Sequence, residues 1–293
     1  MRKLSEADLA SYRERGFFLA RGLFSRAELL PVLSGIDALL CAKLALTEAG
    51  RGVTPSSPET LFDDIHPKVL LLARANRSSL GAVYDAMRKL TPFWSLVGSA
   101  AMSDVVGQLL GATHTGVAFR GAGIRLDIPG EDKWRSAWHQ EYHSQMSAMN
   151  AVVAWFNLVD VSHDMGPVRM AEGSHKQGLL PVRCHDPMNT GRDYTQTFEI
   201  PDVEAVAARY PQVSFETEIG DVVFLSFFLL HESGKNVSPV KSRVTCQVRY
   251  FDVNDETAIR HDWKGGWQEG GDFTKLHPDK VVPQSVVPQK VVP

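Results

Sequence analysis

The N-terminal third of the chain has the pattern of amphipathic helices that begin at polar caps. Ser5 is followed three residues later by Asp8, and Ser25 is followed in the same way by Glu28, a spacing typical of the capping box that begins a helix. After the second box, apolar residues recur with a period near 3.6, at Leu29, Leu33, Ile36 and Leu40. We predict two helices here, the first of which ends at Gly16.

The rest of this region carries shorter signals. Phe17–Ala20 is an apolar run that predicts a strand, and residues 51–58 contain the glycine, prolines and serines of a loop. Residues 79–90 and 103–110 predict further helices. The first 110 residues are therefore expected to be mostly helical.

From His114 onward the chain consists of short apolar segments separated by glycine and proline turns. Residues 151–156 and most of residues 222–230 are apolar, as in buried strands. Polar and apolar residues alternate in residues 243–250, which is typical of a strand with two different faces. The polar face comprises Arg243, Thr245, Gln247 and Arg249. Helices followed by many short strands predict an α+β fold whose β part is a sandwich or a barrel.

Two segments depart from this pattern. Residues 187–208 are polar and contain proline and glycine, which fits either a lid over a site or a surface excursion without a role. The last residues repeat Val-Val-Pro at 281–283, 286–288 and 291–293. Each proline removes a backbone donor, so we expect this tail to be extended and peripheral.

Composition and charge narrow the class of protein. The chain has 293 residues, of which 44% are hydrophobic and 22% charged, as in ordinary globular proteins. A net charge of −3 excludes a strongly basic nucleic-acid surface, and no apolar run approaches the length of a membrane span. Three widely spaced cysteines and an N-terminus without the apolar core of a signal peptide predict a cytoplasmic protein. The expected partner is a small-molecule substrate, and the oligomeric state is open.

The strongest chemical signal is the segment Trp138-His139-Gln140-Glu141-Tyr142-His143. On a strand, residues two apart point to the same side, so His139 and Glu141 can face one point. His231, at the end of the apolar run, offers a second imidazole. Two histidines and one carboxylate on one face of a metal leave three positions open, the arrangement of non-haem Fe(II) oxygenases.

A zinc peptidase is the main rival interpretation. Its motif requires His-Glu-x-x-His on a helix, with the glutamate directly after the first histidine. Here Glu141 is two residues on, although His139 and His143 have the spacing of one helical face. We favour the strand because β-type sequence surrounds the segment, and His143 then becomes a structural residue.

Further segments form an ordered series around this motif. Leu4-Ser5 and residues 16–24 precede it, and residues 154–160 and 172–178 follow it. The series closes with Gly220-Asp221, the pattern His231-x-Ser233-x-x-Asn236-x-Ser238 and Arg243. Together these segments resemble the phytanoyl-CoA dioxygenase family of Fe(II)- and 2-oxoglutarate-dependent oxygenases, over roughly residues 4–252.

The resemblance implies a double-stranded β-helix, a jelly-roll barrel of the cupin-like type, with helices from the N-terminal region packed around it. The whole chain, residues 1–293, would form one oxygenase domain. Residues 1–110 would be its mostly helical part, residues 111–252 the jelly-roll core and residues 253–293 a C-terminal extension.

The resemblance also implies a role for each matching residue. His139, Glu141 and His231 would be the catalytic metal site and bind Fe(II). Arg243 would pair with the distal carboxylate of 2-oxoglutarate, assisted by Ser233.

Three more residues are candidates for the cofactor site. Trp155 would line the cofactor pocket, Gln140 would lie near it, and Arg125 would reach cofactor or substrate. His175, in the family's Gly-Ser-His turn, is interpreted as structural.

One departure from the family concerns the metal carboxylate. The family usually has aspartate where this chain has Glu141, whose side chain is one methylene longer. The charge is retained, which argues against a halogenase, because halogenases replace this carboxylate with a small residue. The implied reaction consumes 2-oxoglutarate and O2, releases succinate and CO2, and hydroxylates a C–H bond of a small molecule. The alternatives are a cupin-like metalloenzyme that does not use 2-oxoglutarate, for which Arg243 would be dispensable, and a non-catalytic small-molecule-binding barrel.

Overall fold

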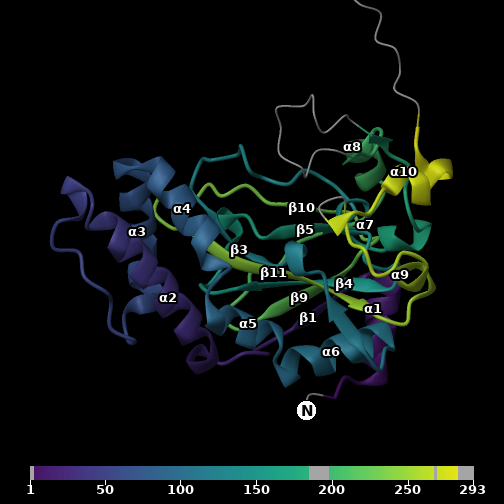
Figure 1. Ribbon diagram of the computed structural model, residues 1–293, viewed down its shortest axis with the longest axis horizontal. Coiled ribbons are helices and arrows are strands. Elements are labelled where there is room, and N and C mark those ends of the chain that lie inside the picture. Colours follow the sequence, from purple (N-terminus) through teal and green to yellow (C-terminus); the bar gives the residue numbers. More distant parts are fainter. Residues whose placement is uncertain (1–2, 185–197, 267–268, 283–293) are drawn as a thin grey trace, which may run out of the picture.

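The computed structural model describes residues 3–184, 198–266 and 269–282, and in it helices surround a central antiparallel sheet (Figure 1). The N-terminal helices are α1 (Glu6–Arg15), α2 (Arg26–Leu44), α3 (Leu61–Ala75), α4 (Arg77–Met87), α5 (Thr91–Val97) and α6 (Ala100–Leu110). Shorter helices follow, namely α7 (Tyr142–Gln145), α8 (Val203–Ala207), α9 (Glu256–Arg260) and α10 (Phe273–Leu276). Single 3-10 turns occupy Glu48–Gly50, Phe119–Gly121, His163–Met165, Ser174–Gln177 and Pro278–Lys280.

The larger sheet has six strands in the order β1-β9-β4-β11-β2, with β3 also paired to β11. Its strands are β1 (Phe17–Ala20), β2 (Thr115–Val117), β3 (Gly123–Asp127), β4 (Ala151–Asn157), β9 (Val222–Ser226) and β11 (Arg243–Asp252). The strand β4 lies between β9 and β11 and is buried along its whole length, which explains why its sequence is a continuous apolar run rather than an alternating one.

A smaller sheet carries one of the candidate site residues. Its strands are β5 (Val168–Ala171), β8 (Gln212–Val213) and β10 (His231–Ser233), in the order β10-β5-β8. A separate pair joins β6 (Arg183–Cys184) to β7 (Phe198–Glu199). All described pairings between these strands are antiparallel, so the α+β class predicted from the sequence is confirmed.

The helix boundaries follow the caps. The Ser5 side chain accepts from the Asp8 amide and the Ser25 side chain from the Glu28 amide, so both predicted capping boxes are confirmed. Gly16 ends α1 with a φ of 83°, a conformation that glycine adopts without strain. In Figure 1 the helices α2, α3 and α4 lie together at one end of the sheet.

Several predicted boundaries need correction. The sequence analysis predicts neither α3, which contains Pro67, nor α5. The apolar run 222–230 is not one strand, because β9 ends at Ser226 and a turn precedes β10. Of the candidate lid, residues 198–208 form β7 and α8, and the remainder lies outside the described residues, as does the Val-Val-Pro tail beyond 282.

The buried apolar residues form one cluster that includes side chains from the N-terminal helices, the six-stranded sheet and the three-stranded sheet. The cluster therefore ties the helical region to the strands that carry the site. Among the described helices, none has the length and hydropathy needed to cross a bilayer.

Gly220 is the glycine whose replacement should cost most stability. Its φ is 93°, and a Cβ built there would lie 1.9 Å from the carbonyl oxygen of Phe24. The two residues are also joined by a hydrogen bond from Phe24 N to Gly220 O of 3.0 Å, so the backbones cannot separate freely. We expect Gly220→Ala to lower the free energy of unfolding by at least about 2 kcal/mol, measured by urea denaturation.

Gly81 provides the matched control. It lies inside α4, and a Cβ built there meets no atom within 4 Å. Gly81→Ala should leave stability unchanged or raise it by up to about 1 kcal/mol, because alanine favours helix. Equal denaturation midpoints for the two variants would contradict the account of Gly220.

Candidate metal centre

A short backbone bridge brings two histidines together. His139 and His231 exchange both main-chain hydrogen bonds, with N-to-O distances of 3.0 and 3.1 Å, in an isolated antiparallel bridge. Their ring centroids lie 4.3 Å apart. Because His231 begins β10, the bridge connects the histidine-containing segment to the smaller sheet.

Each imidazole is oriented by a backbone carbonyl. Nδ1 of His139 lies 2.7 Å from Ala137 O, and Nδ1 of His231 lies 2.9 Å from Leu229 O. A carbonyl oxygen only accepts, so Nδ1 is the donor in both neutral rings. This assignment puts the lone pair on Nε2, the atom that then serves as a metal ligand.

Glu141 comes from the turn that follows His139. Its backbone has helical angles, φ −65° and ψ −34°, and α7 begins at the next residue. The strand predicted for this segment is therefore wrong: only His139 pairs as in a sheet, and Glu141 reaches the same point because the chain turns into α7. Its Oε2 lies 3.9 Å from His139 Nε2 and 3.7 Å from His231 Nε2.

The three side chains fit a single metal ion. One ligand atom from each of His139, Glu141 and His231 lies within 4.8 Å of the others. Both Nε2 atoms face the carboxylate of Glu141, which is only 2% exposed. The two nitrogen lone pairs and the buried carboxylate are therefore directed at one another, as they would be around a cation. Two imidazoles and one carboxylate form the donor set that suits Fe(II) and leaves coordination positions open.

Burial and neighbouring charges set the protonation states of these groups. Burial, together with the nearby His231, lowers the pKa of His139 to about 4. Burial alone would raise the pKa of Glu141, but the attraction of Arg249, His231 and His139 outweighs it and holds that pKa well below its usual range. At neutral pH His139 is thus neutral and Glu141 ionised, which are the forms that bind metals.

A pocket opens at the three side chains. Trp155, Ser233 and Arg243 also line it. They come from three different strands, since Trp155 lies in β4, Ser233 ends β10 and Arg243 begins β11. The residues expected to bind the metal and three of those expected to bind 2-oxoglutarate therefore surround one pocket.

Arg243 is buried and held by the protein itself. It lies opposite Asp127 in the β3–β11 pairing, and its Nη2 is 3.0 Å from Asp127 Oδ2. Its Nη1 lies 3.4 Å from the carbonyl oxygens of both Met165 and Gly234. Burial would raise the pKa of Asp127, but Arg243 and Arg125 together lower it, so the carboxylate stays ionised. These contacts fix the guanidinium at the pocket wall.

Two predicted cofactor residues do not line this pocket. The Gln140 carboxamide donates to Gly178 O at 2.9 Å and to Phe228 O at 2.6 Å, and it accepts from Leu180 N at 2.9 Å. The carboxamide thus joins three backbone segments and does not line the pocket, and a place for Gln140 near the cofactor stays a prediction.

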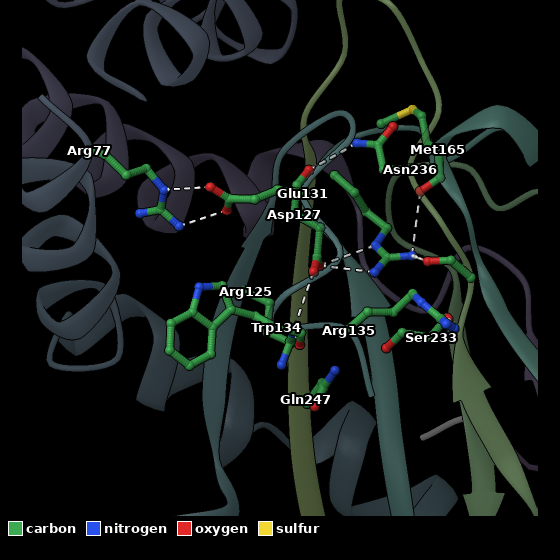
Figure 2. A network of polar contacts seen from close by, with 12 residues as sticks. Arg77, Arg125, Asp127, Glu131, Trp134, Arg135, Met165, Ser233, Asn236 and Gln247 are labelled. Carbon is green, nitrogen blue, oxygen red and sulfur yellow. Dashed lines mark hydrogen bonds and ion pairs between the residues drawn. The ribbon is translucent and has the colours of Figure 1, made fainter. Parts of the chain in front are cut away.

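Arg125 does not line the pocket, because its guanidinium is held by contacts elsewhere. Its Nη2 donates to Trp134 O at 2.6 Å and to Asp127 Oδ1 at 3.2 Å (Figure 2). Arg125 and Arg243 thus contact the same carboxylate, that of Asp127.

His143 lies apart from the metal ligands. Its Nε2 is 2.9 Å from Leu180 O, and burial lowers its pKa to about 4. Because α7 begins at Tyr142, His139 and His143 do not share a helix, and the arrangement required for a zinc peptidase is absent from this segment. His175 is likewise tied to backbone, with Nε2 3.0 Å from Arg13 O.

The sequence analysis does not identify Arg249 as a residue of the pocket or as a partner of Glu141. It lines the pocket, and its Nε lies 3.1 Å from Glu141 Oε1. The signal was present in the alternation of β11, which puts Arg249 on the same face as Arg243. What the alternation does not reveal is the partner, because Glu141 lies 108 residues away.

Comparisons with known proteins agree with this site. The curated relatives include ectoine dioxygenase of Bordetella parapertussis, 26% identical over 255 residues that cover 80% of this chain and 72% of the relative. The ectoine dioxygenase of Bordetella bronchiseptica is 25% identical with the same coverage.

Solved structures share the fold. The epimerase SnoN in complex with Fe3+, alpha ketoglutarate and nogalamycin RO has a TM-score of 0.57 at 20% identity, covering 91% of each chain. EctD from S. alaskensis with bound Fe has a TM-score of 0.55 at 19% identity, covering 86% of this chain and 78% of that one. The family model for phytanoyl-CoA dioxygenase matches residues 12–245. The chain therefore belongs to the phytanoyl-CoA dioxygenase family of non-haem iron, 2-oxoglutarate-dependent oxygenases.

Proposed function

We propose that this protein hydroxylates an unactivated C–H bond of a small-molecule substrate, with release of succinate and CO2. The observation that carries the proposal is the pocket in which His139, Glu141 and His231 converge beside Arg243. A metal triad and a buried arginine in one pocket are what a keto-acid-dependent oxygenase needs. A non-catalytic binding barrel would require neither.

Each residue has a distinct task in this proposal. His139, Glu141 and His231 hold Fe(II), with the two Nδ1 contacts keeping both Nε2 atoms turned inward. Bound Fe(II), with 2-oxoglutarate and O2, supplies the oxidising chemistry. Arg243 pairs with the distal carboxylate of 2-oxoglutarate, a geometry that guanidinium matches well, and Ser233 lies at the same wall.

The rest of the pocket serves to orient and to exclude water. Trp155 and Val153 from β4 and Leu225 from β9 give it an apolar wall. An apolar wall beside the metal ligands can position the substrate C–H bond and protect the oxidising step from side reactions.

We also propose that the strands form a double-stranded β-helix and that residues 1–293 fold as a single domain. The six-stranded and three-stranded antiparallel sheets support the jelly-roll arrangement. The continuous cluster of buried residues supports the single domain. We expect the protein to work in the cytoplasm, where free cysteines such as Cys41 and Cys246 remain reduced.

The class of substrate is a small molecule. The relatives named above act on or bind compounds of this size, namely ectoine and a nogalamycin compound. The candidate site is likewise a pocket within one chain, lined by side chains from several strands, which fits a small ligand.

An anaerobic titration tests the function directly. We expect wild-type protein given Fe(II) and then 2-oxoglutarate to develop the weak visible charge-transfer band of the chelate. His139→Ala should show no band, because a ligand is missing. The matched control is His114→Ala, a histidine outside the triad that should leave the band intact. No band in the wild type, and no change in melting temperature with either component, would overturn the proposed function.

A further inference from the structure

Glu141 could bind a metal through one carboxylate oxygen or through both. A carboxylate offers two oxygens, and a long, flexible glutamate can turn both toward one ion. Such chelation would take one of the three positions that the triad leaves open. 2-Oxoglutarate needs two of those positions and O2 the third, so a chelating Glu141 would obstruct the reaction. The chain therefore needs a means of restricting Glu141 to one oxygen.

Arg249 lies on the edge of the carboxylate where a chelated ion would sit. Its Nε is 3.1 Å from Oε1 of Glu141, and its Nη2 donates to Oε2 at 3.2 Å. The Nη2 contact is an aligned hydrogen bond, whereas the Nε contact is an ion pair without that alignment. With two nearly equal distances, the guanidinium straddles both oxygens. Each histidine Nε2 lies near Oε2, at 3.9 Å for His139 and 3.7 Å for His231.

The guanidinium is itself fixed. Its Nη1 donates to Gly121 O at 2.6 Å, and its Nη2 also contacts Gln247 Oε1 at 3.1 Å. Arg249 extends from β11 opposite Val153 of β4, and its side chain is only 15% exposed. These contacts hold the guanidinium beside Glu141.

We propose that Arg249 is a positioning residue that blocks the chelating edge of Glu141, so that Glu141 binds Fe(II) through Oε2 alone. The inference rests on the proposed function and deepens it. It explains how this chain uses glutamate where the family usually has aspartate.

The test uses Co(II) in place of Fe(II), so that the readout does not depend on turnover. Wild-type, Arg249→Met and Arg249→Lys proteins are loaded with Co(II), and the visible absorption spectrum and the dissociation constant of 2-oxoglutarate are measured. Arg249→Met should still bind one Co(II), because the metal compensates the buried carboxylate. Its spectrum should change, and 2-oxoglutarate should bind about 10- to 100-fold more weakly, the range for residues that orient metal ligands.

Arg249→Lys distinguishes positioning from charge. Lysine retains the positive charge but offers a single point donor that cannot straddle two oxygens. We expect its spectrum and its affinity for 2-oxoglutarate to lie between those of the wild type and of Arg249→Met. The matched control is Arg260→Met, an exposed arginine of α9 paired with Glu256, which should leave both readouts unchanged.

The outcomes separate this inference from the proposed function. A wild-type spectrum and wild-type affinity in either Arg249→Met or Arg249→Lys would overturn the inference and leave the proposed function standing. If Arg249→Met does not fold, Arg249→Lys alone decides. Failure of the wild-type protein to bind Co(II) or Fe(II) would overturn the proposed function itself.

Discussion

Glu141→Ala is expected to abolish Fe(II) binding and succinate formation while the protein stays folded. The substitution removes the only carboxylate of the His139–Glu141–His231 group. Loss of a ligand should weaken Fe(II) binding by more than about 100-fold, since residues that only orient a ligand already contribute about 10- to 100-fold. The measurements are an anaerobic Fe(II) titration, succinate release and the melting temperature.

The fold should survive because Arg249 keeps other partners. After loss of Glu141, its guanidinium still donates to Gly121 O and Gln247 Oε1, so no buried cation is left without hydrogen bonds. Glu256→Ala is the matched control, since that glutamate is exposed and distant in sequence. Normal succinate release by folded Glu141→Ala protein would rule out Glu141 as a ligand.

Local interactions explain what the sequence predicted well. The capping boxes at Ser5 and Ser25 and the glycine that ends α1 act within a few residues, so their effect is visible in the sequence itself. The apolar run of β4 likewise indicates a strand that is buried on both faces. The alternation of β11 indicates a strand with one apolar and one polar face. These signals suffice for the α+β class and for the position of most strands.

The metal site was identified through a partly wrong local structure. His139 and Glu141 were expected to converge because both lie on a strand, whereas they converge because the chain turns into α7 directly after a single bridge. That bridge depends on His231, which lies on a distant strand, and no local pattern encodes it. Residue types with metal-binding chemistry were therefore a better guide than the predicted backbone.

Side-chain partners across the fold were the least predictable feature. The alternation of β11 predicted that Arg243 and Arg249 share a face, yet the choice of Asp127 for one and Glu141 for the other follows from sheet register and from α7. Gln140 shows the converse: its neighbours in sequence are metal ligands, but its carboxamide joins backbone segments remote in sequence. Proximity in sequence did not place it in the pocket.

Arg243→Met is expected to weaken 2-oxoglutarate binding by about 100-fold while leaving Fe(II) binding unchanged. Truncating one partner of a buried charge pair typically costs 2–5 kcal/mol, or roughly 30- to 5,000-fold in affinity. The fold should persist because Asp127 retains its contact with Arg125 Nη2 at 3.2 Å. The measurement is the dissociation constant of 2-oxoglutarate from the Fe(II) protein, read from the chelate band under anaerobic conditions.

Arg125→Met provides the matched comparison, because it removes the other guanidinium that contacts Asp127 but lies outside the pocket. We expect its affinity for 2-oxoglutarate to fall by less than about threefold, as for a residue that acts only through a neighbour. Equal losses in the two variants would mean that the charge network around Asp127, rather than direct pairing with Arg243, determines the affinity. Wild-type affinity in Arg243→Met would mean that Arg243 does not anchor 2-oxoglutarate. A cupin-like metalloenzyme that does not use 2-oxoglutarate would instead show no chelate band in the wild type, and Arg243→Met would leave its activity mostly intact.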